Sequence, residues 1–487
     1  MKNHASQKLL HWEQNDYVLN IVVYALNAII FMALFVGASV LCGRTLQNVF
    51  SETTDFFSFS VLIIVLFAVM ALYLSYENRN FLKNPLNSQM LFLIMELSFV
   101  VCFAVGFYLN HYLRPVAMVA LLTMFLVDTK TGVFTSILFS VLMFLFDAFS
   151  GISIVSASYL LVIGISSGII ATYLLRNIYS RFKLLVISFA ISIPAVLCVI
   201  LQFIRLGDSA LLFTLIYAVI SGVFSAGACI IILPVLEFLF KKVTCFRYAE
   251  LTDHRSKFIK KLIEQAPGTF NHSLVVSNIA EACATAIDED PLLARACAYY
   301  HDIGKLRRPE MFKENQVDKI NLHNDLTPEL SVNIIRSHTQ DGYNFLKKNC
   351  FPKIIADVCL QHHGTMPMLF FYDKAKKFTD GEVDILQYCY QGPKPQTKIA
   401  AIMMIADSSE AAARALSDRS RENVLQLVRN LVNDRMKLGQ FEECEITLKE
   451  INVIINVVVN SLTGVYHDRI EYPAVDIDSI KSEKSEE

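Results

Sequence analysis

The first 240 residues of the sequence contain few charged side chains. They carry 11 Lys and Arg and 10 Asp and Glu, so 67 of the 88 charged residues lie in the last 247. The chain as a whole is 54% hydrophobic, which is more than an ordinary soluble domain contains. This uneven distribution predicts a membrane-embedded half followed by a charged, soluble half.

Two other absences exclude further classes of protein. The sequence has no excess of positive charge, since its net charge is −2, and this argues against binding of nucleic acid polymers. Its 11 cysteines include no CxxC pair, so we expect reduced thiols and neither a disulfide framework nor a zinc ribbon. The N-terminal segment lacks a clear signal-peptide cleavage site, and we expect it to be retained.

Seven apolar runs are long enough to cross ~30 Å of hydrocarbon. They cover residues 18–42, 56–76, 89–109, 131–149, 154–174, 184–204 and 211–239. A shorter run, 115–127, would bring Asp128 and Lys130 into the middle of a span if it were fused to its successor, which is unfavourable. Treating it as a separate crossing leaves most loop lysines and arginines on the side of the charged half. We therefore predict eight crossings with both termini in the cytoplasm. Glu96 lies inside the third span, where an ionisable side chain is a candidate functional residue. The structural alternative is that its carboxylate faces a polar group of a neighbouring helix or lies near the membrane interface.

Helical periodicity continues through the soluble half, and strand alternation never persists, so the predicted fold is all-α throughout. The expected domains are a cytoplasmic N-terminus (1–17), a transmembrane domain (18–240), a juxtamembrane linker (241–270), a soluble helical domain (271–473) and a disordered tail (474–487). In the linker, apolar residues between Phe258 and Ile263 alternate with lysines at helical spacing. This pattern is typical of a basic amphipathic helix at a membrane surface.

Histidines gather in the soluble half, where seven of the chain's 11 lie between His254 and His363. Together with aspartates on successive predicted helices, they make a candidate metal site whose members are His272, His301, Asp302, His338, His362, His363 and Asp407. Imidazole and carboxylate groups together suit divalent ions such as Fe, Mn, Co or Zn. His254 and His323 have no comparable neighbours, and we expect them to be structural.

The pair His301-Asp302 in the stretch YYHDIGK is the centre of this hypothesis. Adjacent residues on a helix point about 100° apart, so both cannot readily hold one ion from the same side. A carboxylate has two oxygens, however, and can bridge two ions ~3.5–4 Å apart. Such a pair of ions would generate a nucleophilic water for attack on phosphorus, and the predicted class is a binuclear metallohydrolase. Gly304 would end the helix beside the substrate, and Lys305 would offer a positive charge to a phosphate.

Eight ordered motifs identify a family. They are GTFNHS, AYYHDIGK, FKENQ, SHTQDG, QHHGT, GPKPQ, IADSSEAAAR and YHDRIEYP. In this order they closely resemble the HD-superfamily phosphohydrolase domain of the bacterial seven-transmembrane HD receptors, from about Leu251 to Pro473, with the multi-span segment before it. Members of this family hydrolyse cyclic di-AMP to the linear dinucleotide. The resemblance therefore implies an enzyme of the bacterial cytoplasmic membrane with its HD domain in the cytoplasm.

The resemblance also implies a ligand set for two transition-metal ions, with iron or manganese favoured. His272, His301, Asp302 and Asp407 would hold one ion, Asp302 would bridge, and His338 with His362 and His363 would hold the other. One of the last two histidines is open to contact the phosphate instead, so that Asp302, Lys305 and His363 form the expected catalytic set. A second HD pair, His467-Asp468, belongs to a family motif outside the metal set.

The chain departs from the family pattern in two places. Residues 43–55 stand where the family carries a large extracytoplasmic domain, which makes an external sensor doubtful. The stretch YCYQGPKPQTKI has Cys389, Gln391 and Ile399 where the family has arginine, proline and glutamate. The second departure removes two charges near the expected substrate cleft.

The sequence leaves three readings of the activity open. The favoured substrate is a cyclic dinucleotide, with Tyr299, Phe371 and Tyr372 available to stack on adenine and Lys305 on phosphate. The alternatives are an HD hydrolase of another nucleotide and a catalytically weak receptor that binds the nucleotide. The lipid bilayer is the other expected partner, and self-association is left open.

Overall fold

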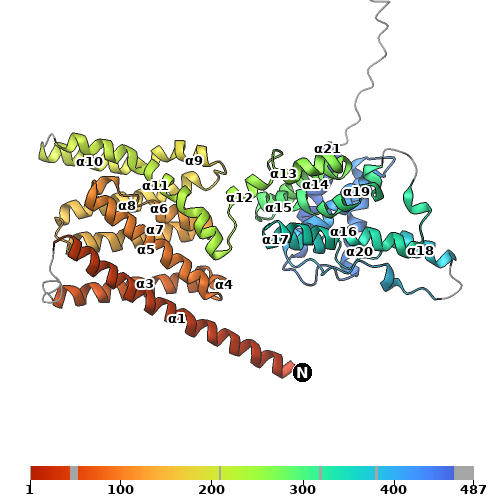
Figure 1. Ribbon diagram of the computed structural model, residues 1–487, viewed down its shortest axis with the longest axis horizontal. Helices are drawn as coiled ribbons and strands as arrows, with labels where there is room; N and C mark the ends of the chain where they lie inside the picture. Colours follow the sequence, from red (N-terminus) through yellow and green to blue (C-terminus); the bar gives the residue numbers. More distant parts are fainter. Residues whose placement is uncertain (1, 44–52, 208–209, 317–320, 379–381, 466–487) are drawn as a thin grey trace, which may run out of the picture. The chain divides into compact units, whose positions relative to one another are not determined.

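The computed structural model describes residues 2–43, 53–207, 210–316, 321–378 and 382–465. The chain forms two compact units, unit 1 (Met1–Arg247) and unit 2 (Tyr248–Glu487) (Figure 1). Within the described residues the regular structure is helical, and the isolated β-bridge found there joins Pro367 and Cys389. The predicted all-α fold class is confirmed. The predicted tail, the pair His467-Asp468 and most of the loop 43–55 lie outside the described residues.

Unit 1 is a bundle of apolar helices. Its elements are α1 (Lys2–Leu41), α3 (Thr53–Glu77), α4 (Arg79–Leu82), α5 (Pro85–Tyr108), η1 (His111–Leu113), α6 (Met118–Leu126), α7 (Thr129–Phe149), α8 (Ile154–Leu175), α9 (Arg181–Ile187), η2 (Ser188–Ser192), α10 (Ile193–Leu206), α11 (Ala210–Phe240) and α12 (Cys245–Leu251). In the described residues, seven helices are long and apolar enough to cross a membrane, and a shorter apolar segment spans His111–Leu126. The protein is therefore a multi-pass membrane protein.

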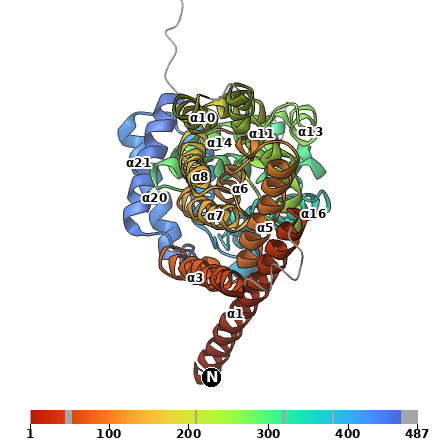
Figure 2. The ribbon, with the colours of Figure 1, turned by 90° about the vertical axis from the view of Figure 1, so that its left-hand side faces the viewer.

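The short helix α6 runs antiparallel to α7. Asp128 caps the start of α7 by accepting hydrogen bonds of 2.8 Å from the backbone N–H and the hydroxyl of Thr131. One turn later, Gly132 packs against α6 so closely that a Cβ there would lie 3.0 Å from the carbonyl oxygen of Ala120. At the opposite end of α7, Asp147 binds Arg114, which precedes α6. The segment from Arg114 to Asp128, which contains α6, therefore connects the two ends of α7, and Figure 2 shows α6, α7 and α8 next to one another.

Burial explains how α6 can be so short. Eight of its nine residues are buried, so neighbouring helices surround it and lipid does not. Nine helical residues extend only ~14 Å, which is less than the ~30 Å of a bilayer core. Non-helical backbone is tolerated at such depth where protein covers it. The segments on either side of α6 can therefore complete the crossing without facing lipid.

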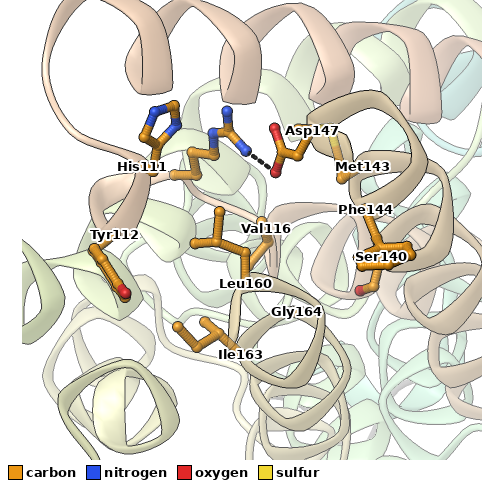
Figure 3. A pocket seen from close by; sticks show the side chains of 11 residues that line it. His111, Tyr112, Val116, Ser140, Met143, Phe144, Asp147, Leu160, Ile163 and Gly164 are labelled. Atoms are coloured by element: carbon orange, nitrogen blue, oxygen red, sulfur yellow. Dashed lines mark hydrogen bonds and ion pairs between the residues drawn. The ribbon is translucent and has the colours of Figure 1, made fainter. Parts of the chain in front are cut away.

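An ion pair is buried in unit 1 at the end of α7. Arg114 Nη1 lies 2.6 Å from Asp147 Oδ2, and the two side chains are 4% and 0% exposed (Figure 3). Arg114 Nε and Asp147 Oδ1 have no hydrogen-bond partner among the described residues, and the pair lines a cavity of about 20 Å³. A cavity of this size can hold about one water molecule. Glu96 on α5 is also buried, and its Oε1 has no hydrogen-bond partner in the described part of the chain.

Unit 2 is a second helical bundle. Its elements are α13 (Lys257–Gln265), α14 (Pro267–Ala286), α15 (Pro291–Tyr300), η3 (Ile303–Arg307), η4 (Pro309–Met311), η5 (Lys313–Asn315), η6 (Leu322–Asn324), α16 (Pro328–Lys348), α17 (Lys353–Gln361), α18 (Leu369–Phe378), η7 (Ile385–Tyr388), α19 (Lys398–Arg414), α20 (Arg421–Lys437) and α21 (Leu448–Val465). Helix α14 packs against α15, α19 and α21, and α16 packs against η3 and α17. These contacts bring the ends of α15 and α17 beside the middles of α14, α16 and α19.

Helix α13 belongs to unit 2 by its packing. Ile259 and Leu262 are buried, and Phe258 makes edge contacts with Phe345 and Phe351 at ring-centroid distances of 5.7 Å and 5.1 Å. The helix is amphipathic as predicted, and its own unit covers most of its apolar face, although Ile263 is 38% exposed. Most of that face is therefore not available for insertion into a membrane, and the lysine-rich face is open to partners.

Candidate metal centre

The seven candidate ligands come from five helical segments and meet in one buried cluster. His272 lies within α14, His338 within α16 and Asp407 within α19. His301-Asp302 follows α15 directly, and His362-His363 follows α17. Apart from His363, each member is 6% exposed or less, and the His363 side chain is 24% exposed. The predicted set is thus brought together in space, with one member at the rim.

Asp302 lies between two groups of histidines. Its Oδ1 is 3.2 Å from His338 Nε2 and 3.8 Å from His362 Nε2. Its Oδ2 is 3.3 Å from His301 Nε2 and 3.9 Å from His272 Nε2. Because donor atoms that share one ion at ~2.1 Å lie about 3 Å apart, each oxygen is positioned to share an ion with a different pair of histidines.

Three overlapping groups of side chains could each hold a metal ion, because within each group the ligand atoms lie within 4.8 Å of one another. The groups are His338-His362-His363, His272-His301-Asp302 and His301-His362-Asp407. His301 and His362 each occur twice, and Asp407 Oδ1 lies 3.0 Å from His272 Nε2. The donor atoms therefore form one continuous cluster with room for more than a single ligand shell.

Four histidines have their Nδ1 atoms held by acceptors, and they are called the clamped histidines below. Nδ1 lies 2.7 Å from the Ala298 carbonyl in His301, 2.5 Å from the Ile335 carbonyl in His338 and 3.1 Å from the Val358 carbonyl in His362. In His272 it lies 2.5 Å from the Glu410 carboxylate. A carbonyl can only accept, so Nδ1 carries the proton and the Nε2 lone pair is left for a ligand. His363 has no such clamp within the described residues.

Buried polar atoms without partners show that the cluster fits metal ions. His301 Nε2 and Asp302 Oδ1 are both inaccessible to solvent, and neither has a hydrogen-bond partner among the described residues. Buried polar groups are normally paired, and a site for a bound ion is a standard reason for an exception. Five imidazoles and two carboxylates form a donor set that suits divalent transition-metal ions.

The cluster keeps its carboxylates ionised without a metal. Although burial opposes it, Lys305 and His301 hold the pKa of Asp302 well below its usual range. Burial also opposes the charged form of His301, but the Asp302 carboxylate raises the pKa of His301 to about 10. Burial and the neighbouring His301 lower the pKa of His362 to about 3. A metal ion entering here must displace the His301 proton, so its affinity falls as the pH falls.

Comparisons with known proteins agree with this geometry. The sequence matches the HD domain family over residues 269–412 and the family described as 7TM receptor with intracellular HD hydrolase over residues 54–244. The cyclic-di-AMP phosphodiesterase PgpH of Listeria monocytogenes serotype 1/2a (strain 10403S) is 36% identical over 432 residues, which cover 85% of this chain and 58% of that protein. The protein of the same name from Bacillus subtilis (strain 168) is 36% identical over 408 residues, or 82% of this chain and 56% of that one.

The chain belongs to the seven-transmembrane HD hydrolase family. The resemblance stated from its motifs is thereby confirmed. A crystal structure of the L. monocytogenes phosphodiesterase PgpH HD domain in complex with cyclic-di-AMP is 46% identical and covers 44% of this chain and 99% of that chain, with a TM-score of 0.43. The chain spans less than two thirds of the length of the two curated relatives. Hydrolases with an HD domain depend on metal ions, in keeping with the His/Asp cluster of unit 2.

Lys305 lies beside the candidate metal ligands of the HD domain. Its Nζ is 2.7 Å from both Asp302 Oδ2 and Glu314 Oε1, and 5.0 Å from the Phe312 ring centroid. Burial opposes the ammonium form, but the two carboxylates raise the pKa of Lys305, which stays charged. Gly304 has a different role from the predicted one. A Cβ on Gly304 would lie 1.9 Å from the His338 carbonyl oxygen, so glycine allows η3 to pack directly on the backbone of α16.

The three aromatic residues predicted to stack on adenine do not behave alike. Tyr299 is 0% exposed and its hydroxyl lies 2.9 Å from His254 Nε2, so that part of the prediction is wrong. Phe371 is 9% exposed and packs into a core cluster with Val332 and Tyr388, which leaves little of its face for a base. Tyr372 is partly exposed and stays a prediction.

Three residues beside the ligands were missed from the sequence. Glu410 fixes His272, as described above, and is itself paired with Arg414. Glu314 holds Lys305, and Tyr390 stacks on His363 with ring centroids 4.3 Å apart. A sequence signal existed for Glu410, because it follows Asp407 by three residues in a helix and so shares its face. Glu314 belongs to the motif FKENQ, but neither Glu314 nor Tyr390 shares a helix face with its partner, so helical spacing gave no signal for them.

The family departures differ in their environment. Ile399 is 2% exposed within α19, so its side chain lies in the core and the expected loss of charge from a substrate cleft does not apply there. Cys389 is half-buried, and its thiol donates to the Ile385 carbonyl at 3.3 Å. Gln391 is exposed. Every predicted metal ligand is present beside these changes.

Proposed function

We propose that this chain is a membrane-anchored, binuclear metal-dependent phosphodiesterase that hydrolyses a cyclic dinucleotide, with conversion of cyclic di-AMP to linear pApA as the favoured reaction. The observation that carries the proposal is the position of Asp302, whose two oxygens face different histidines. Both curated relatives described above are cyclic-di-AMP phosphodiesterases and are 36% identical to this chain.

We assign the ligands to two ions. His272, His301, Asp302 and Asp407 would hold one, and Asp302, His338 and His362 would hold the other, with His363 as the candidate for a further ligand. Iron or manganese is favoured for this mixture of imidazole and carboxylate. When bound, such ions supply an activated water and neutralise charge on the phosphate.

The remaining steps belong to side chains beside the ions. Lys305 is held in place by Glu314 and keeps its charge, so its ammonium group is suited to a phosphate oxygen. Burial and the neighbouring His362 lower the pKa of His363 well below its usual range, so its ring is neutral at pH 7. A neutral imidazole still has one N–H, and His363 at the rim would donate it to the phosphoryl oxygen or the leaving 3′-oxygen.

The cellular setting follows from charge and length. We propose that unit 2 lies in the cytoplasm of a bacterium and that unit 1 crosses its cytoplasmic membrane. The loops assigned to the cytoplasm hold most lysines and arginines of unit 1, as the positive-inside rule requires. The lipid bilayer and the cyclic dinucleotide are the proposed partners, a nucleic acid polymer is not, and self-association is left open.

A weaker activity is the main competing function. Cys389 and Gln391 stand where the family has arginine and proline, and the arginine's charge is absent from the stretch that precedes α19. This observation favours a receptor that binds the nucleotide and turns it over slowly or not at all. A hydrolase of another nucleotide is the second alternative.

Turnover and metal content of the full chain separate these functions. The purified chain in detergent, loaded with Mn²⁺, is incubated with a nucleotide panel and its products are identified by chromatography. We expect two metal equivalents and linear pApA. Asp302→Ala should lose both metals and the activity, because its carboxylate serves both ligand groups. Nucleotide binding without product in a fully metallated chain would overturn the proposal in favour of a receptor, and full metal retention by Asp302→Ala would overturn the bridge.

A further inference from the structure

A basic cleft lies between α13 and the end of α16. It has a volume of about 670 Å³, and Arg255, Lys257, Lys260 and Lys261 contribute four cationic groups against the single carboxylate of Glu264. Phe258 and Phe345 form its apolar wall. The whole chain has a net charge of −2, so this concentration of positive charge is local. Neither metal binding, nor substrate hydrolysis, nor the crossing of the membrane gives a reason for this basic cleft.

The three lysines are not neutralised by the protein. Arg255 pairs with Asp253 at 2.7 Å, but Lys257, Lys260 and Lys261 have no carboxylate oxygen within 4.0 Å in the part of the chain that the structure describes. Lys257 and Lys260 are exposed, and Lys261 Nζ lies 5.5 Å from the Phe345 ring centroid. The three ammonium groups are therefore available to pair with an anion from outside the protein.

Their spacing on α13 is unfavourable for the isolated helix. Residues three or four apart share one face of a helix, and like charges in these positions destabilise it. The opposite face is fixed by the buried Ile259 and Leu262, so the helix cannot turn to separate the charges from one another. An anion bound across Lys257, Lys260 and Lys261 would remove this repulsion.

We propose that this cleft binds the phosphate headgroup of anionic phospholipids. Helix α11, the last long apolar helix, ends at Phe240, and Arg255 follows it by 15 residues. Even a fully extended connection of this length reaches only roughly 50 Å, which limits how far the cleft can lie from the end of α11. The lysine ammonium groups suit the phosphate of a phospholipid, and Phe258 and Phe345 suit the glycerol and the start of the acyl chains. Clusters of basic residues next to a membrane helix attract anionic lipid. The inference needs only the membrane anchoring of the chain and is independent of the proposed reaction.

Lysine footprinting of the full chain tests the proposal. The chain is placed in nanodiscs of phosphatidylcholine alone or of phosphatidylcholine with phosphatidylglycerol, and acylation of each lysine is followed by mass spectrometry. We expect acylation of Lys257, Lys260 and Lys261 to slow several-fold in the anionic discs and to recover at high salt, where charges are screened. Exposed lysines on other helices, Lys377, Lys437 and Lys449, serve as internal controls and should react equally in both discs.

A variant pair sharpens the result. Lys257→Glu should weaken the protection of Lys260 and Lys261, whereas Lys377→Glu should leave it unchanged. Equal acylation of the cleft lysines in both kinds of disc would overturn the proposal. The same slowing in phosphatidylcholine discs after addition of inorganic phosphate or cyclic di-AMP would also overturn it, because the occupant would then be a soluble phosphate compound and not a lipid.

Discussion

At the residue scale, the difference between His362 and His363 decides what each can do. Both follow α17, yet His362 is clamped by a carbonyl and is 1% exposed, whereas His363 lacks a clamp and stacks on Tyr390. A clamp fixes the tautomer and the ring direction that a metal ligand needs. The sequence HH gave no means of telling the two apart.

We therefore predict opposite results for two alanine variants. His362→Ala should lose one metal equivalent, because a clamped ligand is removed. His363→Ala should keep both metals and lose about 10²–10³ in kcat, which is the usual effect of removing one hydrogen-bond donor that faces charge developing in the transition state. Elemental analysis and steady-state kinetics on the same samples measure both. If His363→Ala loses a metal equivalent, His363 is a ligand and the division is wrong.

At the element scale, the Arg114–Asp147 pair fixes the start of the α6 segment to the end of α7. Two charges in a buried site are unfavourable unless they remain together, and removing one partner of such a pair strands the other. Arg114→Met should therefore lower the free energy of unfolding by about 3–5 kcal/mol. The double variant Arg114→Met/Asp147→Leu should lose less than the single one, since no charge is stranded.

Thermal unfolding in a single detergent compares four proteins, namely wild type, Arg114→Met, Asp147→Leu and the double variant. The double variant should unfold at a higher temperature than Arg114→Met. Strictly additive losses from the two substitutions would contradict the pair as an energetic unit.

Helix α21 begins with a capping box that also carries a charge. Glu450 accepts from the Thr447 backbone N–H at 2.7 Å, and the Glu450 N–H donates to the Thr447 hydroxyl at 3.2 Å. A hydrogen bond from Lys398 on α19 and the capping bonds lower the pKa of Glu450 from 4.5 to about 2. A lowered folded-state pKa stabilises the fold above pH 4.5, and this contribution disappears as the pH falls toward 2.

We predict that Glu450→Gln removes part of this pH dependence. Glutamine can keep the capping bonds but not the charge, so the variant should be less stable than wild type at pH 7 and approach it near pH 2. Unfolding midpoints across this pH range measure the difference. Glu450→Ala, which also loses the cap, should be less stable than Glu450→Gln at every pH. A constant gap between Glu450→Gln and wild type would contradict the assignment.

At the scale of the whole molecule, α6 decides the number of crossings. Seven helices are long enough to span a membrane, and an odd number alone would put the two ends of the chain on opposite sides. The segment from Arg114 to Asp128, with α6 in its middle, connects the opposite ends of α7 and would supply the eighth crossing. Reporter fusions after residues 50, 80, 112 and 130 should therefore lie outside, inside, outside and inside. Reporters at 112 and 130 on the same side would show that α6 does not cross.

The sequence by itself determined the features that depend on neighbours in the chain. Apolar run length gave the membrane half, 3.6-residue periodicity gave the all-α class, and the order of the motifs gave the family. Each of these is written in consecutive residues, so no knowledge of packing is needed to read it. The identity of the metal-ligand candidates was available for the same reason.

Only the tertiary structure decided which atoms meet. The two oxygens of Asp302 face the adjacent His301 and histidines from three other segments, Arg114 pairs with Asp147 33 residues later, and Tyr299 is buried although its neighbours form the site. Most of the apolar face of α13, which by pattern alone suits a membrane, is covered by α16 and its surroundings. Periodicity states that a helix has an apolar face, but the partner of that face is set by contacts between segments distant in the chain. Such contacts depend on how all the helices pack at once.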